Sequence, residues 1–561
     1  SMFSSFAKVN MEKPILLVSS FLLLLIQFSH QQAPIVETAL GNIRGDVLTT
    51  RRGRDIYAYR GIHYAKPPTG LRRFAAPVPV EPWNDTLDAL ADGPICPQGG
   101  PTEGLTESED CLSLNVYTTN VNATEPVIVY IHGGGNIYGN ANSEYGASPK
   151  YLLDENVVLV GIQFRLGAFG FLSTSTYEAS GNYGYLDQVL ALKWVQAHIR
   201  SFGGDPTRVT ILGLSAGGMA VTLHLVSPMS SGLFSGAVVM SGSATHHYDI
   251  DNAYWSRKLA HDLGCPRFNT KYLLNCLRQV SWQQIVNVTE GWRTYDLPHI
   301  KWNYEIDGTF LLEHPIESIR SNRFHRVPII AGITYNEFDF SIQAKENDTD
   351  LLDDINENFA LYAPEFLQLN STDESKARTI RSFYYNTTDI YKYNLVGFGQ
   401  MTSDAIIGHG VHRLVELARN FTDVYYYRFD YVGEKSEFPD SLGKPQGACH
   451  ADDIIYILPR TSFSVENNST DIFMVDRMVN VIATFAANGK PPVIENITWT
   501  PSTADELVVL YNNKYPFISN PFYVDRYAMW DELFPLKESA AKALLPTVVL
   551  LMLSASRYLV L

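Results

Sequence analysis

The chain has little positive charge. Its 561 residues contain 43 Lys and Arg against 59 Asp and Glu, which gives a formal net charge of −16. Proteins that bind nucleic acid need a basic face, so this balance argues against a nucleic-acid partner. The sequence also contains no Ser/Gly-rich linker, no repeat and no long block of charge. We therefore expect one large domain rather than the roughly three that the length alone suggests.

Long hydrophobic runs occur near the two ends of the chain. Near the start, Lys13 precedes the apolar run from Ile15 to Ile26, which is too short to span a bilayer comfortably and predicts a signal peptide over residues 1–32. Near the end, Ser539 to Ala541 and the apolar run from Ala543 to Leu553 have features of a glycolipid-anchor signal within residues 536–561. A plain frayed tail is the alternative. We expect a domain over residues 33–535 in a protein that is secreted or anchored at the cell surface.

Cysteine is scarce, and potential glycosylation sites are numerous. The cysteines are Cys96, Cys111, Cys265, Cys276 and Cys449, and their spacing suggests two disulfides that close small loops and one thiol left over. Asn-X-Ser/Thr sequons occur at Asn84, Asn122, Asn287, Asn347, Asn370, Asn386, Asn420, Asn467, Asn468 and Asn496. Together with a signal peptide, these features predict a glycoprotein.

Short, continuous apolar runs predict strands that are buried on both faces. They lie at Val127 to Ile131, Val157 to Ile162, Val209 to Leu212, Gly236 to Met240, Val327 to Ile333 and Val424 to Phe429. A helical stripe covers Leu186 to Ser201. Alternating strands and helices indicate an α/β fold with a large, mostly parallel sheet covered by helices on both faces. We expect Gly41 to Gly45 and Tyr57 to Ile62 to form a small antiparallel unit, and residues 245–325 and 340–420 to form a helical cap.

A serine lies between two glycines where the strand at Val209 to Leu212 gives way to a helix. The pattern Gly213-Leu-Ser215-Ala-Gly217 is typical of a nucleophile elbow, a turn so tight that side chains at the glycines would collide with the backbone. The turn exposes the Ser215 hydroxyl at the positive end of the next helix. On its own this pattern also arises by chance as an ordinary glycine-rich turn.

A serine nucleophile needs a base and an acid that orients the base. Glu337 follows the predicted strand that ends at Ile333, and His450 follows the predicted strand at Val424 to Phe429. The order Ser215, Glu337, His450 is the order of nucleophile, acid and base in α/β-hydrolases. Asp339 and Asp452 are alternative acids. A histidine base predicts that activity falls in acid as the base gains a proton.

A second glycine motif follows another strand. His132-Gly-Gly-Gly135 comes directly after the strand that ends at Ile131 and is typical of an oxyanion-hole loop. Glycines let backbone N–H groups turn into a site with no Cβ in the way. We expect the N–H groups of Gly134, Gly135 and Ala216 to bind the carbonyl oxygen as it becomes charged.

With these motifs, the chain resembles the type-B carboxylesterase and cholinesterase family of α/β-hydrolases. The resemblance rests on Gly61-Ile-His-Tyr-Ala-Lys-Pro-Pro68, Glu109-Asp-Cys-Leu-Ser-Leu-Asn115, His132 to Gly135, Arg165 to Phe171, Gly181 to Gly184 with Asp187 and Gln188, Phe202 to Pro206, Gly213 to Gly218 and Ser241 to Ser243. It implies an α/β-hydrolase fold from about Ala33 to Pro535, Ser215 as nucleophile, Glu337 as acid and His450 as base, and the oxyanion hole named above. It also implies the disulfides Cys96–Cys111 and Cys265–Cys276 and leaves Cys449 free, with no metal or cofactor.

Two departures from the cholinesterases bear on the substrate. Leu214 stands where cholinesterases often have Glu before the nucleophile, and residues 97–110 contain no Trp to receive a choline headgroup by a cation–π contact. We therefore expect a small lipophilic ester as substrate in preference to acetylcholine. The alternatives are a hormone or pheromone ester hydrolase and a catalytically silent adhesion or signalling member of the family.

Overall fold

The computed structural model describes residues 33–536, except for 101, 103, 249, 293–300, 340–346, 370–373, 387, 461–463 and 466–468. The predicted signal peptide lies outside the described residues, and so does the predicted tail except for Leu536. Within the described part of the chain, no helix combines the length and the apolar character needed to cross a membrane.

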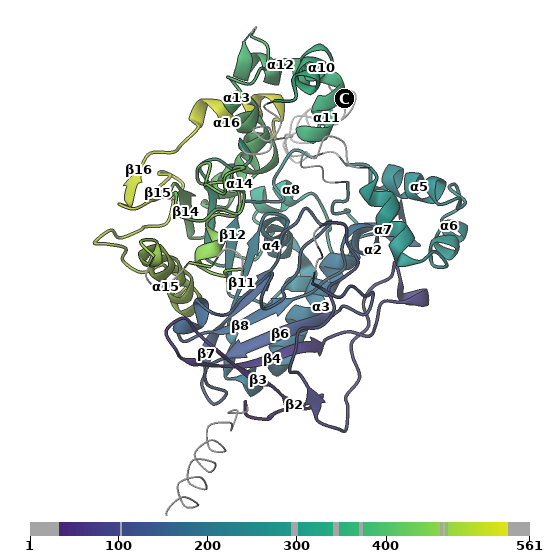
Figure 1. Cartoon of the computed structure of the whole chain (residues 1–561), viewed down its shortest axis with the longest axis vertical. Coiled ribbons are helices and arrows are strands. Elements are labelled where there is room, and N and C mark those ends of the chain that lie inside the picture. Colours follow the sequence, from purple (N-terminus) through teal and green to yellow (C-terminus); the bar gives the residue numbers. More distant parts are fainter. Residues whose placement is uncertain are drawn as a thin grey trace, which may run out of the picture.

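The fold is built on an 11-stranded sheet (Figure 1). Its order is β16 (Phe517–Ser519), β15 (Val509–Asn512), β14 (Val424–Phe429), β13 (Ile329–Thr334), β12 (Gly236–Met240), β11 (Gly204–Leu214), β7 (Glu125–Ile131), β8 (Val158–Ile162), β6 (Ser113–Thr118), β4 (Asp55–His63) and β3 (Asp46–Thr49). Neighbouring strands pair in parallel from β15 through to β8, and antiparallel pairs stand at both edges. The predicted α/β class with a large, mostly parallel sheet is confirmed.

The central strands are buried on both faces because alternate side chains enter two separate parts of the core. In β7, Val127 and Val129 pack with the helices α3 (Tyr183–His198) and α4 (Ala216–Val226), whereas Ile128 packs with α15 (Ile472–Asn488). Figure 1 shows α15 and α3 on opposite sides of these strands. This arrangement explains why continuous apolar runs predict these strands correctly.

The N-terminal region differs from the small antiparallel unit predicted from sequence. A separate three-stranded sheet contains β1 (Val36–Thr38), β2 (Gly41–Arg44) and β5 (Leu87–Asp88). The segment at Tyr57 to Ile62 belongs instead to β4, which pairs with β6 in the large sheet. The apolar side chains of β4, Ile56, Ala58 and Ile62, are completely buried there, so β4 gains more burial in the large sheet than a small one could offer.

The segments predicted to be poor in strands are helical. They hold α5 (Asn252–Asp262), α6 (Thr270–Leu277), α7 (Trp282–Glu290), α8 (Pro315–Arg320), α10 (Thr349–Glu357), α11 (Phe359–Phe366), α12 (Glu374–Tyr385), α13 (Val396–Ser403) and α14 (His409–Ala418). In Figure 1, α5, α6 and α7 gather beside the sheet, and α10, α11 and α12 gather at one end of the molecule. The helical cap is therefore made of these two groups.

The topology brings the candidate site residues to one edge of the sheet. Strands β7, β11, β12, β13 and β14 are neighbours and run parallel, so their carboxyl ends share that edge. The glycine loop follows β7, Ser215 follows β11, and Glu337 follows β13. His450 lies in the segment after β14. An open α/β sheet places its ligand site at this edge.

Candidate active site

Ser215 occupies a strained turn between β11 and α4. Its backbone has φ 59° and ψ −124°, a conformation that L-residues rarely adopt. A Cβ on Gly213 would lie 2.1 Å from the carbonyl oxygen of Gly217, and a Cβ on Gly217 would lie 2.1 Å from that of Ile131. Glycine is therefore required on both sides of the serine. Strand β12 supports the turn, because the Ser215 N–H donates to the carbonyl of Met240 at 2.8 Å.

Glu337 and His450 are in direct contact although 113 positions separate them in the sequence. The distance from His450 Nδ1 to Glu337 Oε2 is 2.5 Å, and the His450 backbone N–H donates to the carbonyl of Glu337 at 3.0 Å. The exposed fractions of Glu337 and His450 are 1% and 8%. A carboxylate that accepts from Nδ1–H leaves Nε2 available to take a proton.

The imidazole and the serine are not hydrogen-bonded. Among the described residues, the hydrogen bonds include none between Ser215 Oγ and His450 Nε2. Catalytic contacts of this kind are often long in unliganded enzymes and tighten when substrate binds. The ring of Phe338 stacks on His450 at 4.8 Å between centroids and fixes the plane of the imidazole. The imidazole of His450 is therefore held in one orientation.

Two residues that the sequence did not single out as candidates hold the other oxygen of the Glu337 carboxylate. Ser241 Oγ donates to Glu337 Oε1 at 2.6 Å, and the backbone N–H of Thr334 donates to the same oxygen at 2.7 Å. Ser241 directly follows β12 and has φ 46°, so its hydroxyl is placed by another tight turn at the same edge of the sheet. Hydrogen bonds to a charged group are among the stronger ones in proteins. A Ser-Gly-Ser sequence does not by itself show which hydroxyl faces the acid.

The alternative acids have other partners. Asp339 accepts a hydrogen bond from Asn336 Nδ2 at 2.6 Å. Asp452 accepts from Ser436 Oγ at 2.9 Å and from the backbone N–H of Cys449 at 2.8 Å, and burial raises the pKa of its carboxyl to about 7. Of the candidate acids, Glu337 is the one whose carboxylate contacts the imidazole.

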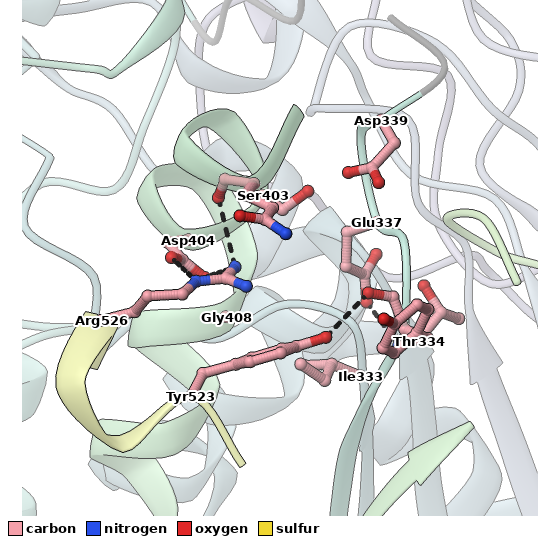
Figure 2. A pocket seen from close by; sticks show the side chains of 11 residues that line it. Ile333, Thr334, Glu337, Asp339, Ser403, Asp404, Gly408, Tyr523 and Arg526 are labelled. Atoms are coloured by element: carbon pink, nitrogen blue, oxygen red, sulfur yellow. Dashed lines mark hydrogen bonds and ion pairs between the residues drawn. The ribbon is translucent and has the colours of Figure 1, made fainter. Parts of the chain in front are cut away.

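A small cavity of about 10 Å³ lies beside Glu337. Thr334 and Asp339 also line it, and Asp404 and Arg526 form an ion pair at its other side (Figure 2). A volume of this size has room for about one water molecule. Glu337 therefore lies next to a polar part of the interior.

The glycine loop lies against the elbow. A Cβ on Gly133 would lie 3.0 Å from Ser215 Cβ, so the loop and the serine are in close contact. Gly134 has φ 103° and Gly135 has φ 62°, conformations that favour glycine. Among the described residues, no hydrogen bond uses the N–H of Gly134, Gly135 or Ala216. Unused N–H groups at these positions meet the requirement for an oxyanion hole.

His132, at the start of the same loop, stays neutral. Burial lowers the pKa of its imidazole to about 4. The ring stacks on Phe164 at 4.2 Å between centroids, and Nδ1 lies 2.9 Å from the carbonyl of Gly133. His132 therefore packs against the loop as a neutral ring and adds no positive charge there.

The cysteines pair as the resemblance implies. Disulfides join Cys96 to Cys111 and Cys265 to Cys276, and Cys449 is a free, buried thiol. Burial raises the pKa of the Cys449 thiol above its usual range, so it is not a reactive thiolate although it adjoins His450.

The sequon asparagines that the structure describes are exposed. These are Asn84, Asn122, Asn287, Asn347, Asn386, Asn420 and Asn496. Asn370, Asn467 and Asn468 lie outside the described residues. Exposure at each described position leaves room for a glycan.

The fold and the site define a serine hydrolase of the α/β-hydrolase type. Comparison with known proteins narrows this class. The model of the carboxylesterase family matches residues 32–530. Esterase E4 from Myzus persicae is 35% identical over 503 residues, which cover 84% of this chain and 89% of that protein.

Other relatives agree with this match. Juvenile hormone esterase from Tribolium castaneum is 31% identical over 510 residues, covering 83% of this chain and 85% of that protein. The pyrethroid hydrolase Ces2e from Rattus norvegicus is 33% identical over 536 residues, which cover 91% of this chain and 92% of that protein. The solved structure of juvenile hormone esterase from Manduca sexta has a TM-score of 0.80 and 24% identity, covers 90% of this chain and 100% of that one, and shows the shared fold. The chain belongs to the carboxylesterase family and is a carboxylic ester hydrolase.

Proposed function

We propose that Ser215, His450 and Glu337 form the catalytic triad of this esterase, with Gly134, Gly135 and Ala216 as its oxyanion hole. The observation that carries the proposal is the 2.5 Å contact between His450 Nδ1 and Glu337 Oε2 at the sheet edge where Ser215 occupies its strained turn. The unused N–H groups of the glycine loop, which packs against the serine, support it.

The proposed reaction has two steps. Ser215 Oγ attacks the ester carbonyl while His450 Nε2 takes the hydroxyl proton, and the three N–H groups bind the oxyanion. His450 returns the proton to the departing alcohol, which leaves an acyl-serine. Water that gives a proton to His450 then attacks the acyl group, and the acid is released. Glu337 keeps the imidazole in the required tautomer and stabilises its cation. The reaction needs neither a metal nor a cofactor.

We propose a lipophilic ester as substrate in preference to acetylcholine. Leu214 precedes the nucleophile and is 4% exposed in the apolar core, so no carboxylate stands at that position to attract a cation. The absence of Trp from residues 97–110 removes the aromatic face that a quaternary ammonium needs. A hormone or pheromone ester is a second candidate, because relatives named juvenile hormone esterase are among those that match. Relatives are also named for pyrethroid and acylcarnitine hydrolysis.

We further propose that residues 1–32 are a signal peptide, that residues 33–535 form the esterase domain, and that residues 536–561 are a hydrophobic tail, either an anchor signal or a plain frayed tail. The two disulfides and the exposed sequon asparagines support export, because disulfides persist in oxidising compartments. The exported protein is then a glycoprotein, either secreted or held at the cell surface.

Ser215→Ala tests the catalytic proposal. We expect turnover of a simple aryl ester to fall by at least about 10³-fold, because the covalent step is lost. A fluorophosphonate probe should label the natural protein at Ser215 and fail to label the variant. Unchanged turnover in the variant would refute the triad. A natural protein that neither labels nor hydrolyses esters would favour the silent adhesion or signalling alternative.

A substrate series tests the proposed specificity. The purified protein should hydrolyse uncharged acyl esters of increasing chain length with higher kcat/KM than the matching choline esters. A preference for choline would overturn our interpretation of Leu214 and of the Trp-free segment. A hormone ester belongs in the same series as the second candidate.

A further inference from the structure

The side-chain amide of Gln98 is hydrogen-bonded to the backbone of the segment that follows the glycine loop. Gln98 Oε1 accepts from the Gly139 N–H at 2.7 Å, and Gln98 Nε2 donates to the Gly139 carbonyl at 3.2 Å and to the Cys96 carbonyl at 3.0 Å. Only 6% of Gln98 is exposed. A buried amide with these partners is hydrogen-bonded at both ends, so it holds Gly139 in one position.

Gly139 packs closely against His132 and Gly133, at the start of the glycine loop. It has φ 123°, and a Cβ there would lie 2.4 Å from the carbonyl oxygen of Gly133 and 2.5 Å from His132 Nδ1. The residues between Gly133 and Gly139 form a turn that is closed by a hydrogen bond. In it, the Gly134 carbonyl accepts from the N–H of Tyr138 at 3.1 Å. A shift of Gly139 therefore moves the turn that carries the N–H groups of Gly134 and Gly135.

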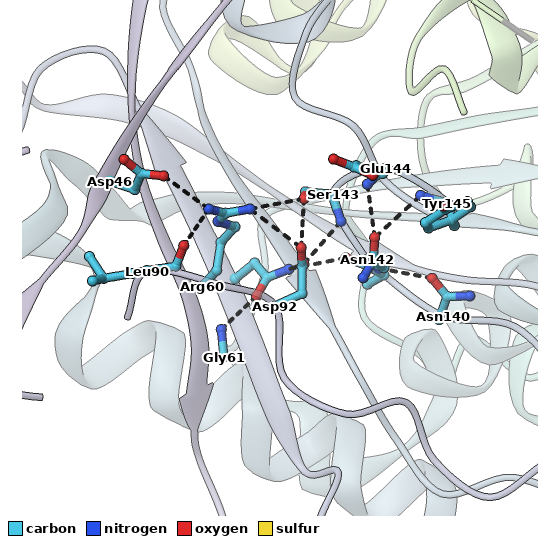
Figure 3. A network of polar contacts seen from close by, with 12 residues as sticks. Asp46, Arg60, Gly61, Leu90, Asp92, Asn140, Asn142, Ser143, Glu144 and Tyr145 are labelled. Carbon is cyan, nitrogen blue, oxygen red and sulfur yellow. Dashed lines mark hydrogen bonds and ion pairs between the residues drawn. The ribbon is translucent and has the colours of Figure 1, made fainter. Parts of the chain in front are cut away.

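The segment just beyond Gly139 is fixed separately. Asn115 Nδ2 donates to the Ala141 carbonyl at 3.2 Å, and Asp92 accepts from the Ser143 backbone N–H at 3.0 Å and from Ser143 Oγ at 2.6 Å. Figure 3 shows Asp92 and Arg60 on one side of this network and Asn140 and Asn142 on the other. Residues 141–143 are held by this network, and Asn136 is held by Tyr185 and Gly167. The contact of Gln98 with Gly139 is the one that bears on Gly133, next to Ser215.

We propose that Gln98 is a positioning residue for the oxyanion hole. It acts through Gly139 and Gly133, whose own Cβ would lie 3.0 Å from Ser215 Cβ. Gln98 stands two positions after Cys96, which the Cys96–Cys111 disulfide ties to Cys111 beside β6. The amide thereby connects the disulfide-closed loop to the N–H groups that bind the oxyanion. This inference rests on the proposed catalytic role of Ser215 and the glycine loop.

Gln98→Met removes both hydrogen bonds to Gly139 while keeping a side chain of similar length. Displacement of the oxyanion donors weakens binding of the transition state more than binding of the ester, because charge develops on the oxygen only in the transition state. We expect kcat to fall about 10- to 100-fold, with KM changed less than about threefold. Affinity for a trifluoromethyl ketone, which forms a tetrahedral adduct with a serine, should fall by the same factor as kcat/KM.

Gln196→Met is the matched control. Gln196 Nε2 also donates to two backbone carbonyls, those of Pro206 at 2.8 Å and Leu233 at 3.0 Å, but it lies on α3, away from the glycine loop. This control should lose thermal stability and keep kcat and inhibitor affinity. Equal losses of kcat in the two variants would overturn the proposal, since a general loss of packing would then explain both.

Gln98→Glu tests the positioning role of Gln98 if Gln98→Met does not fold. The carboxylate keeps the size of the side chain and the acceptor for the Gly139 N–H, but it presents an oxygen to the Gly139 carbonyl in place of a donor. We expect kcat to fall here as well, and a folded Gln98→Glu variant with natural kcat would overturn the proposal. If the natural protein itself fails to label at Ser215, the catalytic proposal has failed. If it labels and Gln98→Met matches it in kcat and inhibitor affinity, the role of Gln98 alone is refuted.

Discussion

At the scale of single residues, the site depends on how one carboxylate is shared. One oxygen of Glu337 accepts from His450, and the other accepts from Ser241 and the backbone of Thr334. Together these hydrogen bonds hold the carboxylate in one orientation. A neutral side chain of the same shape would keep the packing and lose the orientation of the imidazole.

Glu337→Gln isolates that effect. We expect kcat to fall by about 10³- to 10⁴-fold, because an amide that donates to Nδ1 selects the tautomer in which Nε2 already carries the proton. Steady-state kinetics on an aryl ester measures the loss. Asp339→Asn is the control, since Asp339 bonds to Asn336 and not to His450, and we expect it to stay within about threefold of the natural kcat. A larger loss in Asp339→Asn than in Glu337→Gln would make Asp339 the acid.

The candidate residues could be predicted from sequence where a local motif marks them, and their supports could not. Ser215 and the glycine loop stand in short patterns whose geometry follows from the turn they form. The supporting roles of Ser241 and Gln98 follow from no such turn, because their partners lie 96 and 41 positions away in the chain. A contact at that separation exists only once the sheet has formed.

At the scale of elements, continuous apolar runs predicted the central strands. Strand β6 is an instructive contrast: Ser113, Asn115 and Thr118 make it look polar, yet all of its residues are buried. Its Asn115 is satisfied by Gly61, Asp92 and Ala141, so the burial of a polar side chain is offset by hydrogen bonds that the sequence does not show. Propensity and periodicity cannot reveal such a strand.

The disulfide between Cys265 and Cys276 gives a prediction at the same scale. It ties the segment after α5 to α6, in the group of cap helices beside the sheet. Replacing both cysteines by Ser should lower the free energy of unfolding by about 3 kcal/mol, because the unfolded chain regains the entropy of the opened loop. Denaturant unfolding measures this change, and kcat should remain within about twofold. A stability equal to that of the natural protein would show that the cap does not share in global unfolding.

At the scale of the whole molecule, buried histidines make stability depend on pH. Burial lowers the pKa of His132 to about 4, of His224 to about 3 and of His409 to about 4. These rings are neutral in the folded protein, whereas in the unfolded chain they take up protons below about pH 6.5. Protons therefore bind first to the unfolded state, and stability is lost as the pH falls through that value toward 4.

Each of these histidines should cost about 1.4 kcal/mol of stability between pH 8 and pH 5.5, or about 4 kcal/mol together. Denaturant unfolding at the two pH values measures the difference. His224→Gln should reduce it by about 1.4 kcal/mol, because glutamine does not titrate. A pH difference in His224→Gln equal to that of the natural protein would show that this ring is already accessible to protons.

The wide spacing of the site along the chain has a consequence for synthesis. The proposed nucleophile, acid and base come from segments after three different strands, and the proposed base, His450, is synthesised last. If His450 is the base that we propose, a nascent polypeptide cannot hydrolyse an ester before residue 450 has left the ribosome and the neighbouring strands have paired. The appearance of esterase activity would then report when folding is complete. A translation product that ends before residue 450 would have no esterase activity.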